Sequence, residues 1–80
     1  MIIAKKKLGR ITIKRYDNRV YVLDSNENVI KKFAFAKDEK FAIEYHEDTR
    51  SFKVKHGQTE RNIIEEYDLH GNQVNSVERV

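Results

Sequence analysis

The chain has 80 residues, no Cys, no Pro and a formal net charge of +3 at pH 7. The length corresponds to one small domain, which buries only about 60% of the surface that its unfolded chain exposes, so we expect a thin core. The absence of Cys excludes disulfides and thiolate metal sites, and no apolar run approaches the ~20 residues that a membrane helix needs. These totals predict a single β-rich domain over residues 1–80, located in the cytoplasm.

Charge is divided unevenly along the chain. Residues 1–40 hold eleven basic and five acidic residues, a net charge of +6, and residues 41–80 hold five basic and eight acidic residues, a net charge of −3. Halves of opposite charge favour association of two copies of the chain, or a basic surface for an anionic partner.

Turn-forming residues recur about every ten positions, which is typical of an antiparallel β-protein. Runs rich in β-branched and aromatic residues lie between them, at residues 11–13, 20–23, 33–35, 41–45 and 52–54. The pattern predicts an all-β fold: an antiparallel meander of about seven short strands, arranged as an open sheet, a sandwich or a small barrel.

The first hairpin is expected to turn at Asp17-Asn18. A two-residue loop there pairs Ile13 with Val22 on one face and Lys14 with Tyr21 on the other. On that second face Thr12 meets Leu23, so we expect partial burial on both faces of this hairpin.

A second hairpin is expected to turn at Asp48-Thr49. The resulting register pairs Tyr45 with Phe52 and Ile43 with Val54 on one face. On the other face it places Glu44 opposite Lys53 and His46 opposite Ser51. Apolar and charged pairs agree on one register, which supports this hairpin.

The segment 59–69 has two interpretations. Thr59 is a suitable N-cap for a helix with Ile63, Ile64 and Tyr67 along one stripe, which predicts an α+β fold. The alternation of Ile63, Glu65 and Tyr67 fits a strand, and we prefer the strand because regular hairpins precede it. The helix near 59–69 remains the alternative.

One local resemblance to a known family is present. The segment Tyr67-Asp68-Leu69-His70-Gly71-Asn72-Gln73-Val74 resembles the hairpin of YD-repeat proteins, and residues 21–29 resemble a degenerate copy that lacks the Gly. The resemblance implies hairpin geometry only. It covers too little of the chain to imply a function, since YD-repeat proteins carry long arrays.

A basic and aromatic cluster in the first hairpin is the candidate binding site. By alternation, Lys14, Tyr16, Arg19 and Tyr21 share one face, and Arg15 lies among them in sequence. Basic side chains bind phosphates and tyrosine rings stack on bases, as on a small sheet that binds single-stranded nucleic acid.

No motif indicates catalysis, so we expect no enzyme, no catalytic residue, no cofactor and no small-molecule substrate. The only glycines, Gly9, Gly57 and Gly71, are isolated and exclude a glycine-rich phosphate loop. Glu44, His46 and Glu47 are the nearest approach to a metal site. On a strand, however, Glu47 points away from the other two, so we expect no metal.

The expected function is therefore a non-enzymatic binding or regulatory module. It acts through a face or an edge of its β-sheet, with a protein or a second copy of the chain as partner. The alternative is a nucleic-acid-binding protein that uses the basic first hairpin.

Overall fold

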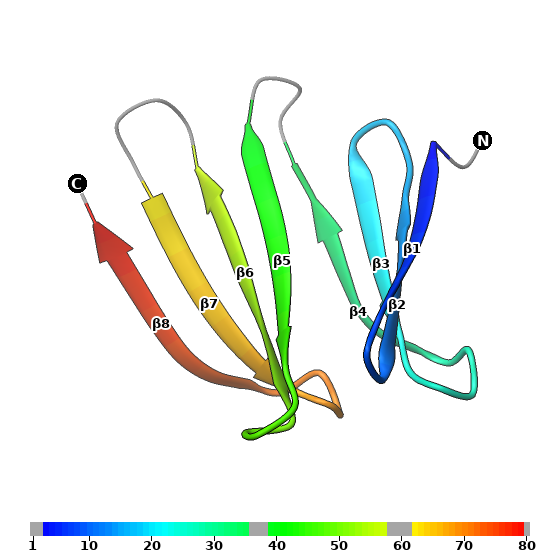
Figure 1. Cartoon of the computed structure of the whole chain (residues 1–80). Coiled ribbons are helices and arrows are strands. Elements are labelled where there is room, and N and C mark those ends of the chain that lie inside the picture. Colours follow the sequence, from blue (N-terminus) through cyan, green and yellow to red (C-terminus); the bar gives the residue numbers. More distant parts are fainter. Residues whose placement is uncertain (1–2, 36–38, 58–61, 80) are drawn as a thin grey trace. The chain divides into compact units, whose positions relative to one another are not determined.

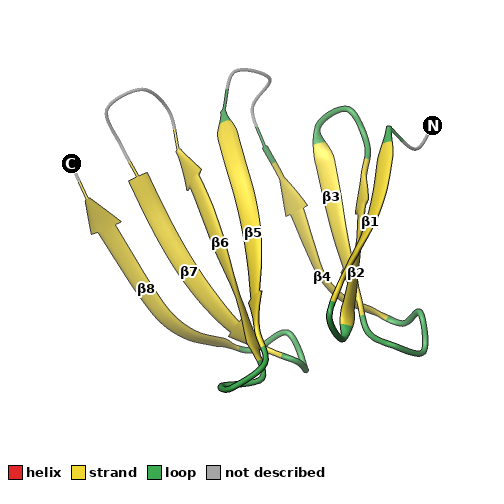
Figure 2. Cartoon of the chain, viewed as in Figure 1, coloured by secondary structure: helices red, strands yellow, loops and turns green. Residues whose placement is uncertain are grey.

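The computed structural model describes residues 3–35, 39–57 and 62–79, which form strands and the turns between them (Figures 1 and 2). None of these residues is helical, and this part of the chain contains no helix that is long and apolar enough to cross a membrane. The chain divides into two compact units, Met1–Lys37 and Asp38–Val80. We call them the N-terminal and C-terminal units. The prediction that both belong to one domain stays a prediction.

Each unit is an antiparallel meander in which consecutive strands are neighbours. The N-terminal sheet has the order β1-β2-β3-β4, with strands Ala4–Leu8, Ile11–Arg15, Arg19–Leu23 and Val29–Ala34. The C-terminal sheet has the order β5-β6-β7-β8, with strands Lys40–His46, Ser51–Gly57, Asn62–Asp68 and Gln73–Arg79. Both sheets are open, and the prediction of an all-β antiparallel fold is confirmed.

The strand count differs slightly from the prediction, because eight strands form where about seven were expected. The additional strand is β1, whose sequence Ala-Lys-Lys-Lys-Leu has neither alternating hydrophobicity nor β-branched residues. It forms because its backbone pairs with β2, from Ala4 opposite Arg15 to Leu8 opposite Ile11. Pairing with β2 thus makes this segment a strand although its local preference for strand structure is weak.

Both predicted hairpin registers are confirmed. Between β2 and β3, Ile13 pairs with Val22 and Lys14 with Tyr21. Between β5 and β6, the four predicted pairs form, from Ile43 with Val54 to His46 with Ser51.

The segment 62–68 is the strand β7, so the helix alternative is wrong for these residues; Thr59, its expected cap, lies outside the described residues. β7 pairs with β6 on one side and with β8 on the other. A helix satisfies its own backbone groups, whereas this segment satisfies the facing backbone groups of two neighbours. The hydrogen bonds to both neighbouring strands therefore favour the strand over the helix, which the sequence pattern supports almost equally.

Buried side chains concentrate on one face of each sheet. In the N-terminal unit, Ile11, Val20 and Val22 are at most 1% exposed and alternate onto the same face. Leu23 is 4% exposed on the opposite face, as expected from its pairing with Thr12. In the C-terminal unit the buried hydrophobic residues are Phe52, Val54 and Tyr67. The rings of Phe52 and Tyr67 stack with 5.4 Å between their centroids.

The third and fourth strands of both units are joined by the same turn. Asp24 accepts hydrogen bonds through Oδ1 from the backbone N–H groups of Asn26 and Asn28, at 2.8 and 2.9 Å. Asp68 does the same for His70 and Asn72, at 2.8 and 3.0 Å. These backbone donors hold the pKa of both aspartates below the ordinary value.

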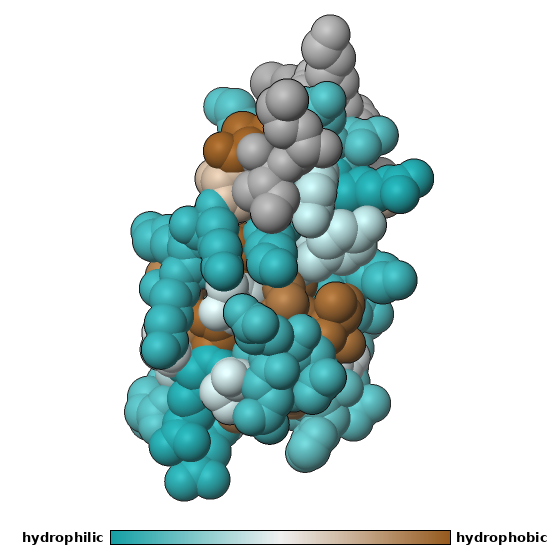
Figure 3. All heavy atoms as spheres, turned by 90° about the vertical axis from the view of Figure 1, so that its right-hand side faces the viewer, coloured by the Kyte–Doolittle hydropathy of each residue, from teal (hydrophilic) through white to brown (hydrophobic). Residues whose placement is uncertain are grey.

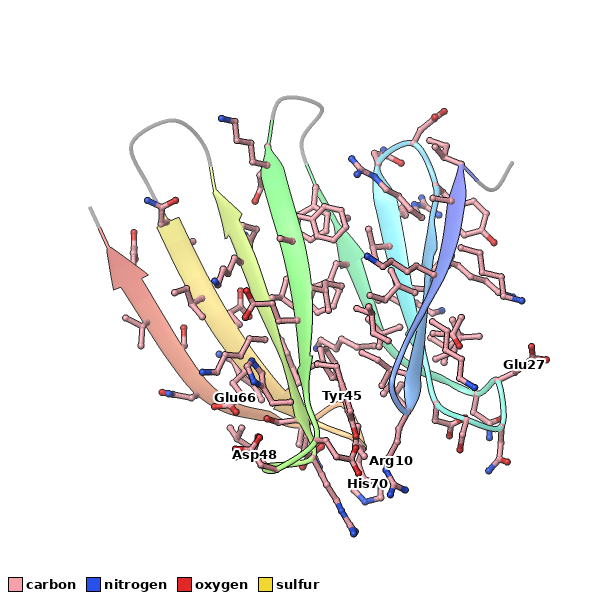
Figure 4. The ribbon with its side chains drawn as sticks, in the orientation of Figure 1. Arg10, Glu27, Tyr45, Asp48, Glu66 and His70 are labelled. Atoms are coloured by element: carbon pink, nitrogen blue, oxygen red, sulfur yellow. The ribbon has the colours of Figure 1, made fainter. Side chains whose placement is uncertain are left out.

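The two turns also share their backbone conformation. Glu27 and Gly71 occupy equivalent positions and have φ angles of 64° and 83° (Figure 4 labels Glu27). A β-bulge follows each turn, at Ile30 of β4 opposite Val22–Leu23 and at Val74 of β8 opposite Glu66–Tyr67. The two units therefore share one four-stranded arrangement. At the position of positive φ, the N-terminal unit has Glu27 where the C-terminal unit has a glycine.

Burial predicts the effect of removing one methylene group from the N-terminal unit. Ile11→Val should lower the free energy of unfolding by about 0.5–1.5 kcal/mol, because Ile11 is fully buried. Ile3→Val removes the same group from a side chain that is 57% exposed, and should change it by less than about 0.5 kcal/mol. Urea denaturation measures both values, and equal losses would contradict the assignment of the core.

Candidate functional site

The candidate site lies on the face of the N-terminal sheet opposite Ile11, Val20 and Val22. We call it the basic face and define it by the side chains that alternation places there: Lys5, Lys7, Lys14, Tyr16, Arg19, Tyr21 and Lys32. Four of the five predicted site residues are on it, and the structure thus brings them together as expected.

Arg15 is the exception among the predicted site residues. It pairs with Ala4 on one side and with Val20 on the other, so alternation places it on the face that carries the buried side chains. Adjacent residues of a strand point to opposite faces, and Arg15 therefore cannot act together with Lys14 on one flat ligand.

A row of lysines crosses the whole sheet on the basic face. Lys5, Lys14 and Lys32 lie on β1, β2 and β4, and Tyr21 occupies the position between them on β3. Like charges directly opposite one another are destabilising, as for Lys5 and Lys14. The row is therefore a place where a bound anion would relieve repulsion.

Two tyrosines accompany this row: Tyr21 lies within it and Tyr16 lies beside it. The rings of Tyr16 and Tyr21 make an edge-to-face contact with 5.2 Å between centroids, and Lys32 Nζ lies 5.8 Å from the centroid of the Tyr21 ring. A cation at this distance from an aromatic face is attracted to it. Tyr21 is thus held between Tyr16 and Lys32, while Arg19 lies across the turn from Tyr16, whose N–H donates to the Arg19 carbonyl.

The surroundings of the row contain little negative charge. The four strands of the N-terminal unit carry eight basic residues and no acidic residue. In the described part of this unit the acids are Asp17, Asp24 and Glu27, all in turns. Hydrophilic side chains cover most of the surface in the view of Figure 3, with hydrophobic side chains visible between them.

Sequence reasoning counted Lys5 and Lys7 among the basic residues of the N-terminal region, but it placed neither them nor Lys32 on the face of the site. Lys5 and Lys7 belong to the strand that was not predicted, so their face was unknown. The face of Lys32 depends on the bulge at Val22 and Leu23, which makes Leu23 pair with Val29 and Tyr21 with Lys32. Without the bulge, Lys32 would be displaced by one residue and lie on the other face.

The C-terminal unit contains a different polar cluster, on the same face as Phe52 and Val54. His56 on β6 contacts two carboxylates: its Nδ1 lies 2.8 Å from Glu39 Oε2, and its Nε2 lies 2.5 Å from Glu65 Oε1. The Tyr67 hydroxyl donates a hydrogen bond to the other oxygen of Glu65. The side chains of Glu39, His56 and Glu65 are each less than 20% exposed.

The contacts of His56 favour its protonated form. Both ring nitrogens face carboxylate oxygens, and only the imidazolium can donate to both. Burial by itself lowers the pKa of His56, but the hydrogen bonds to Glu65 and Glu39 outweigh it and raise the pKa above the ordinary value. Burial and the neighbouring Glu65 likewise raise the pKa of Tyr67.

The residues considered for a metal form pairs only. Glu44 accepts a hydrogen bond from Lys55 Nζ at 3.0 Å, which lowers the pKa of Glu44, and lies 3.5 Å from His46 Nε2. The backbone register of Glu44 with Lys53 was correct, but the ion pair is formed with Lys55 on the diagonal. Among the residues that the structure describes, no group of three or more His, Cys, Asp or Glu side chains is arranged to hold a metal ion.

The raised pKa of His56 predicts a pH-dependent stability. A histidine whose pKa is higher in the folded state than in the unfolded state stabilises the fold when it is protonated. This contribution is complete below the unfolded-state pKa of about 6.5 and is lost as the pH rises through the folded-state pKa. The free energy of unfolding of the unmodified protein should therefore exceed that of His56→Gln most at pH 5–6, and the excess should shrink above pH 7. Denaturation between pH 5 and 9 measures it. His70→Gln, in the β7–β8 turn (Figure 4), is the control, and a pH-independent excess for His56→Gln would refute the imidazolium assignment.

Comparison of the chain with protein-family models, with curated proteins and with solved structures gives no match. The resemblance to a YD-repeat hairpin therefore stays a prediction. The function has to be inferred from the side chains described above.

Proposed function

We propose that the chain is a non-enzymatic nucleic-acid-binding module of the cytoplasm, and that the basic face is its binding surface. The observation that carries this proposal is the row of lysines across β1, β2 and β4, on strands that contain no acidic residue. Neutralisation of backbone phosphates by such a row supplies affinity that is independent of sequence and sensitive to salt.

The charge of the two units supports an anionic ligand for the N-terminal unit. That unit has ten basic and three acidic residues, a net charge of +7, and the C-terminal unit has six basic and ten acidic residues, a net charge of −4. The strands of the C-terminal unit carry both signs, and Glu44 of β5 accepts a hydrogen bond from Lys55 of β6. Its charges are partly satisfied internally, whereas within the described residues no ion pair engages Lys5, Lys14 or Lys32.

The proposal is tested with two charge reversals at neighbouring residues. Lys14→Glu should weaken binding of a labelled 12-nucleotide strand by about tenfold at low salt, because it removes one phosphate contact and adds repulsion. Arg15→Glu makes the same change on the opposite face and should alter binding less than threefold. Fluorescence anisotropy measures both, and circular dichroism checks that both variants are folded. The absence of binding by the unmodified protein would refute the proposal.

A protein partner is the second candidate, and the edge strand β8 favours it. The first five residues of β8, from Gln73 to Val77, carry no charge, and Val74 and Val77 are 58% and 42% exposed. The edge strands β1 and β4 carry lysines, which discourage pairing with another strand. An uncharged edge favours the addition of a strand from a partner, and a second copy of the chain is the simplest one.

Self-association through β8 has a direct test. If β8 pairs with a second copy, the mass of the protein in solution should rise from monomer to dimer with concentration. Val77→Lys should keep it monomeric, because it places a charge on this edge. Val29→Lys, at an exposed valine of β4, is the matched control. Analytical ultracentrifugation distinguishes the two, and a monomer at all concentrations would refute this candidate.

A further inference from the structure

The arrangement of charges and rings on the basic face specifies more than nucleic acid in general. We propose that the ligand is a single strand that crosses the four β-strands of the N-terminal unit, with its phosphates on Lys5, Lys14 and Lys32 and a base against Tyr16. This inference rests on the proposed function. It adds the strandedness of the ligand, its path over the sheet and separate roles for the lysines and the tyrosine.

The path follows from the register. Lys5, Lys14, Tyr21 and Lys32 are successive partners across β1, β2, β3 and β4, so they form a line at right angles to the strands. Neighbouring strands are about 4.8 Å apart, and the line therefore extends over about 14 Å. Along the direction of the strands, in contrast, the lysine row is followed by uncharged Thr12 and Leu23 on the central strands β2 and β3. A backbone that crosses the strands meets three cations, and one that runs along the central strands meets fewer.

The side of the path on which the bases lie also follows from the sheet. Tyr16 directly follows β2, and Arg19 is the first residue of β3. Each lies two residues closer to the turn than Lys14 and Tyr21, which corresponds to about 6.8 Å. The ring of Tyr21 makes an edge-to-face contact with Tyr16 and has Lys32 Nζ over it. Tyr16 is at the end of this group, next to the cationic Arg19. We therefore assign base stacking to Tyr16, with Tyr21 as the ring that positions it.

The width of a four-stranded sheet selects a single strand over a duplex. The major groove of a duplex is about 12 Å wide and admits a helix or a two-stranded ribbon, but not the face of a four-stranded sheet. Paired bases are out of reach of Tyr16, because their rings are covered by their neighbours in the stack. An unpaired base exposes its ring to an aromatic side chain, and a small sheet of four strands binds two or three such bases.

The experiment compares the salt dependence of two double variants. For three phosphate contacts on a single strand, the logarithm of the affinity should fall with the logarithm of the salt concentration with a slope of about −2. Lys5→Gln with Lys32→Gln should reduce the slope to about −0.7, the value for one contact. Lys6→Gln with Lys53→Gln removes the same charge from the opposite face of β1 and from β6, and should leave the slope unchanged. Oligo-dT and oligo-U of 12 nucleotides, measured in parallel, distinguish DNA from RNA.

A second variant separates the tyrosine from the lysines. Tyr16→Leu should lower the affinity for oligo-dT by about tenfold, since stacking of one base is lost, and should leave the salt slope unchanged. The same variant should bind an abasic strand of equal length as well as the unmodified protein does. A 12-base-pair duplex should bind at least tenfold more weakly than the single strand.

The outcomes separate this inference from the proposed function. Three results would each overturn the inference while nucleic-acid binding stands. They are equal binding of duplex and single strand, an unchanged salt slope for the Lys5 and Lys32 double variant, and an equal loss of affinity on the abasic strand for Tyr16→Leu. Failure of the unmodified protein to bind any of these ligands would overturn both.

Discussion

The strict alternation of side chains in paired antiparallel strands is the constraint on which the rest of this structure depends. Once Ile13 is set opposite Val22, every residue of β2 and β3 is assigned to a face. The buried residues Ile11, Val20 and Val22 then occupy one face, and Lys14, Tyr16 and Tyr21 must occupy the other. The candidate site is thus a consequence of burying the reverse side of the same strands.

The two units use one four-stranded plan for different electrostatic environments. In the C-terminal unit, opposite charges meet within the sheet, as in the hydrogen bond of Lys55 with Glu44 and the contacts of His56 with Glu39 and Glu65. In the N-terminal unit, Lys5 and Lys14 face each other across the sheet. The exposed pair of Lys55 with Glu44 contributes little to stability, unlike the contacts of His56, which are less than 20% exposed. For the exposed charges, the difference between the units matters mainly for what each surface attracts.

The repeated turn explains how both units reach the same topology from different sequences. Asp24 and Asp68 each bind two backbone N–H groups of the following residues, and both turns place one residue at positive φ. Asp and Asn side chains favour such turns because they satisfy backbone donors locally. The strands on either side have little in common, as Tyr21-Val22 and Glu65-Glu66 show.

The sequence by itself determined the all-β class, both hairpin registers and four of the residues on the basic face, because alternation and turn chemistry are local properties. Tertiary structure decided what local patterns leave open. Pairing with β2 made a strand of the lysine-rich β1, pairing on two sides made a strand of residues 62–68, and a bulge moved Lys32 onto the face of Lys14. The contacts of His56 with Glu39 and Glu65, 17 and 9 residues away in sequence, likewise arise only when three segments are assembled. In each case the structure is decided by an interaction with a backbone or side-chain partner that is distant in sequence. Local preferences do not include such interactions.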